Sequence, residues 1–145
     1  MIAVDSNLLI YSHRADSEFF AASKKLIDSL RHQSAQWAIP WPCVHEFISI
    51  VTHPRIYKPA TPIDDALLAV DSWIAGGNVN LLSESPGYFE KLRAIALTAK
   101  SSGAVIHDAR IAALCLHHGV RELWTADRDF LSFPQLKVRN PLIKL

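Results

Sequence analysis

Met1-Ile2-Ala3-Val4-Asp5-Ser6-Asn7-Leu8-Leu9-Ile10 opens the chain, and in it a short apolar segment runs directly into an acid that two small polar residues follow. Residues 2–5 are typical of a buried strand. Near the other end, Leu123-Trp124-Thr125-Ala126-Asp127-Arg128-Asp129-Phe130 has the same order of strand and then acid. Ligands of an open parallel sheet bind beyond the carboxyl ends of its strands, where residues far apart in sequence converge. We therefore expect Asp5 and Asp127 to meet at an active site on that edge.

Strand-like and helix-like segments alternate through the rest of the chain, which is typical of βα units around a parallel sheet covered on both faces. A chain of 145 residues fits one domain of ordinary size with a sizeable core. The sequence therefore predicts an α/β fold: a single domain over residues 1–145, with a central, mostly parallel sheet flanked by helices on both faces. The expected strands are residues 2–5, 37–39, 78–82, 121–125 and 136–139, and the expected helices are residues 17–32, 42–51, 61–75, 85–100 and 106–118.

Polar residues with capping side chains precede two of these helices. Asp16 or Ser17 is the expected cap of the helix over 17–32. Thr61, next to a proline that suits a first helical position, is the expected capping hydroxyl of a later helix. Residues 52–59 contain two prolines, which remove backbone donors and disfavour helix in the residues before them, so we expect an irregular loop there.

The charge of the chain is nearly balanced, with 15 basic and 14 acidic side chains, while half of its residues are hydrophobic. This composition argues against a basic protein that coats nucleic acid and against a disordered acidic tail. If a cation neutralised four of the 14 acids, 10 would remain against 15 basic side chains. The rest of the surface would then attract a polyanion mildly.

The two cysteines, Cys43 and Cys115, lie in helical patterns and have no second pair at a zinc-like spacing. We expect buried thiols in a reducing compartment rather than disulfides or a metal staple. The N-terminus shows no basic leader or cleavage site, and no apolar run approaches the ~20 residues that a membrane span requires. The sequence therefore predicts a cytoplasmic protein that does not associate with a membrane.

Four acids stand at element ends or on helix faces beside apolar runs: Asp5, Glu46, Asp108 and Asp127. Any one of them alone is explained more simply as a helix cap or a surface ion pair. Together they favour a shared cation, because clustered carboxylates repel one another unless a cation joins them. Mg²⁺ and Mn²⁺ prefer oxygen ligands, and one or two such ions can activate water against a phosphodiester.

The chain resembles a PIN-domain ribonuclease, specifically the VapC toxins of bacterial toxin-antitoxin pairs, over nearly its whole length. Each matching segment is common by itself, but their order and spacing together are specific. The segments are Val4-Asp5-Ser6-Asn7-Leu8-Leu9, Val44-His45-Glu46-Phe47, Thr52-His53-Pro54-Arg55-Ile56-Tyr57, His107-Asp108-Ala109-Arg110-Ile111-Ala112-Ala113, Thr125-Ala126-Asp127-Arg128-Asp129-Phe130 and Asn140-Pro141-Leu142.

The resemblance implies a catalytic set of four acids, of which three hold the metal. Asn7 and Thr125 match the family's auxiliary polar positions, where a hydroxyl or amide can orient a metal carboxylate or hold a water. Asp129 is a further auxiliary candidate: it either joins a second metal or caps the short helical turn through Phe130 and Leu131. The implied catalytic residues are Asp5, Glu46, Asp108 and Asp127, and the implied metal ligands are Asp5, Asp108 and Asp127.

The loop cations His53, Arg55 and Lys58, with Tyr57 between them, can supply backbone contacts and a stacking ring for single-stranded RNA. The alternative is a solvated loop that its prolines hold. Arg110 is another candidate RNA contact. It lies two residues past the nearest acid, about 200° around a helix, so a surface arginine is the simpler interpretation.

The resemblance thus implies an Mg²⁺-dependent endoribonuclease toxin that hydrolyses tRNA or rRNA with a metal-activated water, and Mn²⁺ can take the place of Mg²⁺. It also implies a homodimer and a cognate antitoxin of the VapB type. The alternative is a catalytically silent PIN-like module that binds RNA or protein, and loss of an acid would favour it. An aspartyl phosphotransferase of the haloacid dehalogenase type would want a second aspartate where this chain has Asn7.

Overall fold

A parallel sheet of five strands forms the centre of the molecule in the computed structural model, which describes residues 1–143. The strand order is β3-β2-β1-β4-β5, and every neighbouring pair is parallel. All five expected strands are confirmed: β2 is one residue longer than its expected range, and the other four are one or two residues shorter. The strands are β1 (Ile2–Val4), β2 (Trp37–Pro40), β3 (Val79–Leu82), β4 (Glu122–Trp124) and β5 (Val138–Arg139).

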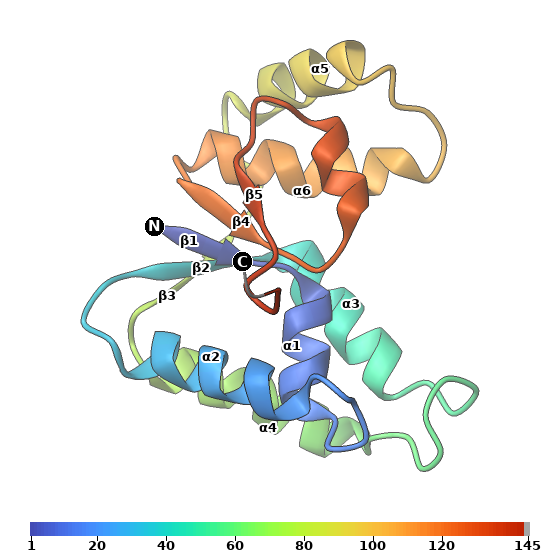
Figure 1. Ribbon diagram of the computed structural model, residues 1–145. Coiled ribbons are helices and arrows are strands. Elements are labelled where there is room, and N and C mark those ends of the chain that lie inside the picture. Colours follow the sequence, from blue (N-terminus) through green and yellow to red (C-terminus); the bar gives the residue numbers. More distant parts are fainter. Residues whose placement is uncertain (144–145) are drawn as a thin grey trace.

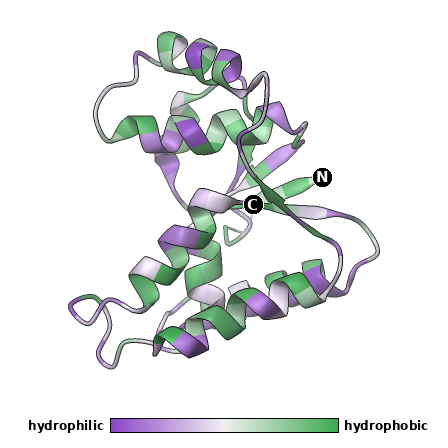
Figure 2. Ribbon diagram, turned by 180° about the vertical axis from the view of Figure 1, so that it is seen from behind, coloured by the Kyte–Doolittle hydropathy of each residue, from purple (hydrophilic) through white to green (hydrophobic). Residues whose placement is uncertain are grey.

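Helices cover both faces of the sheet, as expected. Figure 1 shows α5 and α6 together on one side of the strands and the helices α1 to α4 on the other. In Figure 2, hydrophilic and hydrophobic residues alternate around α5, as in a helix with one face in water. The helices are α1 (Ser6–His13), α2 (Phe20–His32), α3 (Trp41–Val51), α4 (Ile63–Ala75), α5 (Tyr88–Thr98), α6 (Val105–His117) and the 3₁₀ helix η1 (Arg128–Ser132).

The core sits on the central strands. Ala3 and Val4 of β1 and every residue of β2 are buried, which fits strands that have helices on both faces. Cys43 on α3 and Cys115 on α6 are free and buried, as the sequence analysis predicts. Among residues 1–143, no helix is long and apolar enough to cross a membrane.

The helix α1 is absent from the sequence-based expectations. It follows β1 with no loop between them: Asp5 is the last extended residue, and its carboxylate accepts the backbone N–H of Ser6. A carboxylate in this position satisfies a backbone donor that the helix itself leaves free. The strand-then-acid pattern therefore marks a helix start as well as a strand end.

The expected caps, Asp16 or Ser17 for one helix and Thr61 for the other, are wrong. The Ser17 hydroxyl accepts the N–H of Phe19, the residue before α2, and does not cap the helix. Asp16 binds the guanidinium of Arg14, and α2 begins at Phe20 without a side-chain cap. Pro62, not Thr61, is the N-cap residue of α4. The Thr61 hydroxyl accepts from Arg14 Nη1 at 3.2 Å and lies 3.1 Å from His13 Nε2. Asp16 and Thr61 thus tie α1 to its surroundings and do not start helices.

Candidate active site

The four acids singled out in the sequence line a single cavity of about 370 Å³. Asp5 follows β1, and Asp127 stands between β4 and η1, so both lie at the carboxyl edge of the sheet. Glu46 reaches the cavity from α3 and Asp108 reaches it from α6. The convergence expected for an open parallel sheet is therefore present.

Asp5 is the most buried of these acids, with 4% of its surface exposed. Its carboxylate accepts hydrogen bonds from the backbone N–H of Ser6 at 2.8 Å and from the Thr125 hydroxyl at 2.7 Å. Asn7 Nδ2 at 3.3 Å and the Cys43 thiol at 3.4 Å complete its surroundings. Burial raises the pKa of Asp5, and these hydrogen bonds partly oppose the rise. The carboxylate is held in one orientation at the base of the cavity.

Ser6 connects two of the acids. Its hydroxyl donates to Glu46 Oε1 at 2.9 Å, while its backbone N–H donates to Asp5. Ser6 is 3% exposed, so water does not compete freely for these bonds. The sequence analysis does not single out Ser6. The available signal was its place as the first helical residue after an N-capping acid, where the hydroxyl turns back toward the strand end.

Asn7 and Thr125 join the two chain segments that carry Asp5 and Asp127. Asn7 Nδ2 donates to the Thr125 hydroxyl at 3.0 Å, and Asn7 Oδ1 accepts the N–H of Ala126 at 3.1 Å. The Thr125 hydroxyl also accepts the N–H of Asp127 at 3.0 Å. These polar side chains therefore hold together strand ends that are more than a hundred residues apart along the chain.

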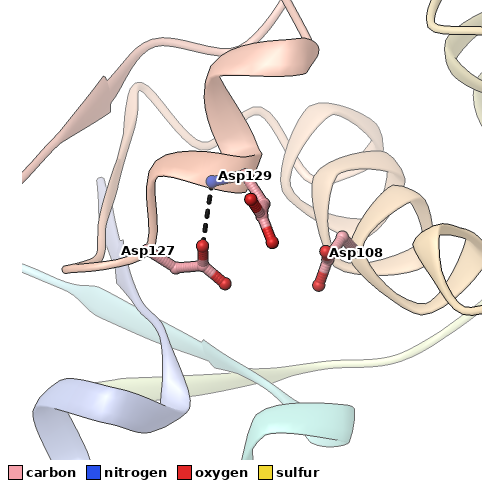
Figure 3. A group of neighbouring side chains, drawn as sticks. All are labelled: Asp108, Asp127 and Asp129. Atoms are coloured by element: carbon pink, nitrogen blue, oxygen red, sulfur yellow. Dashed lines mark hydrogen bonds between the residues drawn. The ribbon is translucent and has the colours of Figure 1, made fainter.

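Asp108, Asp127 and Asp129 form an acidic cluster, since one carboxylate oxygen of each lies within 4.8 Å of the other two. Figure 3 shows the three side chains turned toward a common space between α6 and η1. Asp127 Oδ1 accepts the N–H of Asp129 at 2.8 Å, so Asp127 is the residue that caps η1. Of the two interpretations of Asp129, the helix cap is therefore wrong, and its carboxylate faces the other two acids.

The pKa of Asp108 reflects the concentration of acids around the cavity. Its pKa is raised to about 6, first by burial and then by repulsion from Asp127, Asp5, Asp129 and Glu46. Within residues 1–143, no ion pair involves any of these five acids. The ion pairs that do occur are Arg14–Asp16, Lys24–Asp28, Arg31–Asp28, Arg110–Glu84 and Lys137–Glu122. Among the residues that the structure describes, no basic side chain pairs with the negative charge gathered at this site.

The expected RNA-contacting residues lie outside this acidic set. Arg55 and Lys58 are exposed on the loop after α3, and His53 Nδ1 accepts the N–H of Arg55. Arg110 does not line the cavity: its guanidinium donates to Glu84 Oε1 at 2.7 Å. Of this loop, Tyr57 is the residue that reaches the cavity.

A parallel sheet whose carboxyl edge gathers acids from four separate segments of the chain is the arrangement expected of a class of proteins, the PIN domains. The PIN-domain sequence model matches residues 2–136 of this chain. The chain belongs to this family and, within it, to the VapC ribonucleases, the toxins of toxin-antitoxin pairs.

Three relatives illustrate the similarity. Ribonuclease VapC43 of Mycobacterium tuberculosis is 32% identical over 142 residues, which cover 98% of this chain and 96% of the relative. The VapC20 structure from Mycobacterium tuberculosis has a TM-score of 0.67 at 15% identity and covers 91% of this chain and 94% of that one. The VapBC2 structure from Rickettsia felis, bound to a promoter DNA fragment, has a TM-score of 0.66 at 15% identity and covers 97% and 98%.

Proposed function

We propose that this protein, with residues 1–145 as its single domain, is a cytoplasmic toxin that cleaves RNA internally and depends on Mg²⁺, which Mn²⁺ can replace. The observation that carries the proposal is the set of acids around one cavity that have no basic partner among residues 1–143. Family membership supports the ribonuclease activity.

The donor set fits a hard divalent cation. Asp108 and Asp127 offer carboxylate oxygens within 4.8 Å of each other, and the charge of Asp5 repels both of these acids. Hard cations take such oxygen ligands, and mutually repelling carboxylates gain most from them. We propose Asp5, Asp108 and Asp127 as the metal ligands, with Asp129 as an auxiliary one. A bound Mg²⁺ would lower the pKa of a water and offset the charge that develops on the phosphodiester.

Asp5 and Glu46 have complementary roles in this proposal. Asp5 is buried and held by Thr125 and Ser6, so it keeps one fixed orientation toward the centre of the site. Glu46 is held through the Ser6 hydroxyl by one oxygen, which leaves its other oxygen free to accept a proton from the attacking water. We assign Glu46 the proton-accepting role and the aspartates the metal-binding role, with Asn7 and Thr125 fixing their geometry.

The substrate we propose is a folded RNA, tRNA or rRNA. VapC20 is a sarcin-ricin loop cleaving toxin, and we extend an RNA target of this kind to the present chain. His53, Arg55 and Lys58 stand on the loop that brings Tyr57 to the cavity, where they can contact backbone phosphates on either side of the cleaved bond. Arg110 would have to leave Glu84 to do the same.

The partners we propose are a second copy of the chain and a VapB-type antitoxin. The solved structures with the same fold include VapBC2 of Rickettsia felis, bound to a fragment of its promoter DNA. An antitoxin that blocks the cavity would have to bring a group that tolerates or neutralises the acidic cluster. A basic side chain is the simplest such group.

Cleavage of total bacterial RNA by the purified protein tests the proposal. We expect discrete fragments with Mg²⁺ or Mn²⁺ and none with EDTA or with the Asp108→Asn variant. Asp28→Asn is the matched control, because Asp28 is an aspartate of α2 that Lys24 and Arg31 neutralise, and it should cleave normally. Absence of cleavage by folded, antitoxin-free protein under every condition would instead support a PIN-like module that only binds RNA or protein.

A further inference from the structure

We propose that Tyr11 and Tyr57 form a binding site for one unpaired nucleobase of the RNA, immediately beside the acidic site. The inference rests on the proposed ribonuclease function and adds what that function leaves open: how the enzyme selects the strand that it cuts. Both tyrosines line the same cavity as the four acids. The chain has three tyrosines, and Tyr88, the third, is not among the residues that line the cavity.

The cavity has an acidic end and an aromatic end. On α1, Asn7 stands beside the acids and Tyr11 follows four residues later, about 6 Å further along the helix on the same face. On α3, Glu46 and Ile50 have the same relation. The cavity therefore extends from the carboxyl edge of the sheet along α1 and α3, with polar lining at the start and apolar and aromatic lining one turn beyond.

Arg14 holds the ring of Tyr57 in place. Its guanidinium carbon lies 4.3 Å from the ring centroid, in a cation–π arrangement. Asp16 binds the same guanidinium with two hydrogen bonds, 2.9 Å to Nε and 2.7 Å to Nη2, and Thr61 accepts a third. Arg14 covers one face of the ring, and Tyr57 also lines the cavity. The loop that carries Tyr57 is thereby fixed to the end of α1.

Tyr11 is held in a similar way. Its ring packs against Phe19, with centroids 5.1 Å apart and planes tilted by 43°. Among residues 1–143, neither the Tyr11 nor the Tyr57 hydroxyl donates to or accepts from another protein group, although the rings are half-buried. Two fixed rings with unused hydroxyls at one end of a cavity offer both a stacking face and a hydrogen-bonding group to a ligand.

An unpaired nucleobase matches this arrangement. The phosphate that the acids process is joined through its ribose to a base, so a base must lie within a few ångströms of the reaction. Stacking on a tyrosine satisfies the flat face of any base, and a hydroxyl can meet its polar edge. In a continuous duplex the bases stay stacked inside the helix and cannot enter. The aromatic end would therefore favour loops and single strands.

Fluorescence anisotropy with a labelled ten-nucleotide single-stranded RNA tests the proposal. The measurements use the full chain carrying Asp108→Asn, with Mg²⁺ present and RNA integrity checked at the end. We expect Tyr11→Leu and Tyr57→Leu each to weaken binding about tenfold, while Tyr11→Phe and Tyr57→Phe stay within about threefold of the parent. Tyr88→Leu is the matched control and should bind as the parent does.

A second measurement changes the RNA and leaves the protein intact. Each decamer lacks one base at a different position. At one position, loss of the base should weaken binding to the parent about tenfold and leave the affinity of the Tyr57→Leu variant unchanged. Equal binding of all the abasic decamers, or folded Leu variants that bind like the parent, would overturn the nucleobase site. RNA cleavage by the wild type is scored separately, so tyrosine-dependent binding without cleavage would refute the nuclease proposal alone.

Discussion

The acids of this protein live in two different electrostatic settings. On the outer surface, Asp16, Asp28 and Glu84 each face a basic side chain, and the pKa of each is lowered by that partner. In the cavity, burial raises the pKa of Asp5 and, together with neighbouring acids, raises the pKa of Asp108 to about 6. The charged form of a carboxyl group is thus stabilised on the surface and destabilised in the cavity.

The difference indicates that the acids of the cavity lower the stability of the fold. A surface acid that binds a lysine contributes little either way, because water already solvates both charges. Carboxylates gathered without a counterion oppose folding until a cation arrives, which is the usual condition of a site prepared for binding. Removing charge should therefore have opposite consequences in the two regions.

The largest expected effect comes from removing charge in the cavity. Asp5→Asn and Asp108→Asn should each lower RNA cleavage by at least about 100-fold, because each removes a ligand charge and keeps the side-chain shape. Asp108→Asn should also stabilise the metal-free protein by about 1 kcal/mol, since it removes the cost of burying the charge and the repulsion from the neighbouring acids, both reduced by solvent. Cleavage assays with urea unfolding measure both. Retained cleavage in both variants would refute the assignment of the metal site.

A smaller effect is expected from Ser6, which holds charges of the cavity in place without carrying one. Ser6→Ala removes the 2.9 Å hydrogen bond to Glu46 and should weaken Mn²⁺ binding and cleavage by about tenfold, the range typical of groups that orient metal ligands. Titration calorimetry with Mn²⁺ gives the affinity independently of activity. Ser6→Thr keeps the hydroxyl and should recover most of the loss, so an equal defect in both variants would point to packing instead.

The acids of the cavity and those of the surface should also change the stability of the fold with pH in opposite directions. Asp108 has a raised pKa in the folded state, so its contribution is fully present below about pH 4 and is lost as pH rises to about 6. The loss should be about 1 kcal/mol after allowance for solvent. The pKa of Asp28 is lowered, so Asp28 contributes in the opposite sense. The stability that it adds to the fold is lost as the pH falls through its lowered pKa, below the ordinary pKa of an aspartate. Urea unfolding of metal-free wild type and Asp108→Asn between pH 4 and 7 isolates the first contribution, which should vanish in the variant.

The smallest effect is expected on the surface. Lys24→Ala removes the partner of Asp28 across one turn of α2 and should cost about 0.3–0.5 kcal/mol of unfolding free energy. Cleavage should stay at the wild-type rate. Urea titration and the RNA assay check the two statements. A loss of cleavage in this variant would mean that α2 contributes to the site, contrary to the division drawn above.

Much of the architecture follows from the sequence alone. The hydrophobic pattern predicts all five strands and the helices α3, α4, α5 and α6. Strands and helices that alternate in this way are typical of a parallel sheet covered by helices. Because β1 and β4 are neighbours in that sheet, the acids at their ends must meet, and this topological rule accounts for the convergence of Asp5 and Asp127.

What the sequence leaves open depends on which partner a polar side chain takes. Asp16 and Thr61 have the chemistry of helix caps, but Arg14 takes both, and no local pattern announces a contact made 47 residues away. The sequence does not reveal the helix α1 because this helix is short, only eight residues, and largely buried, and it has no amphipathic stripe. Asp129 is misjudged as a cap because Asp127, two residues earlier, already occupies that role.

The position of β1 in the middle of the sheet also determines when the site can come into being. Asp5 leaves the ribosome first, yet the groups that orient it and complete the acidic set lie at Asp108, Thr125 and Asp127. Contacts of such long sequence separation form late, after most of the chain has been made. The site can therefore assemble only after residues as far along the chain as Asp127 have been made. A chain that stopped before Asp127 would lack part of the acidic set and the strand β5 beside β4, and could not form the complete site.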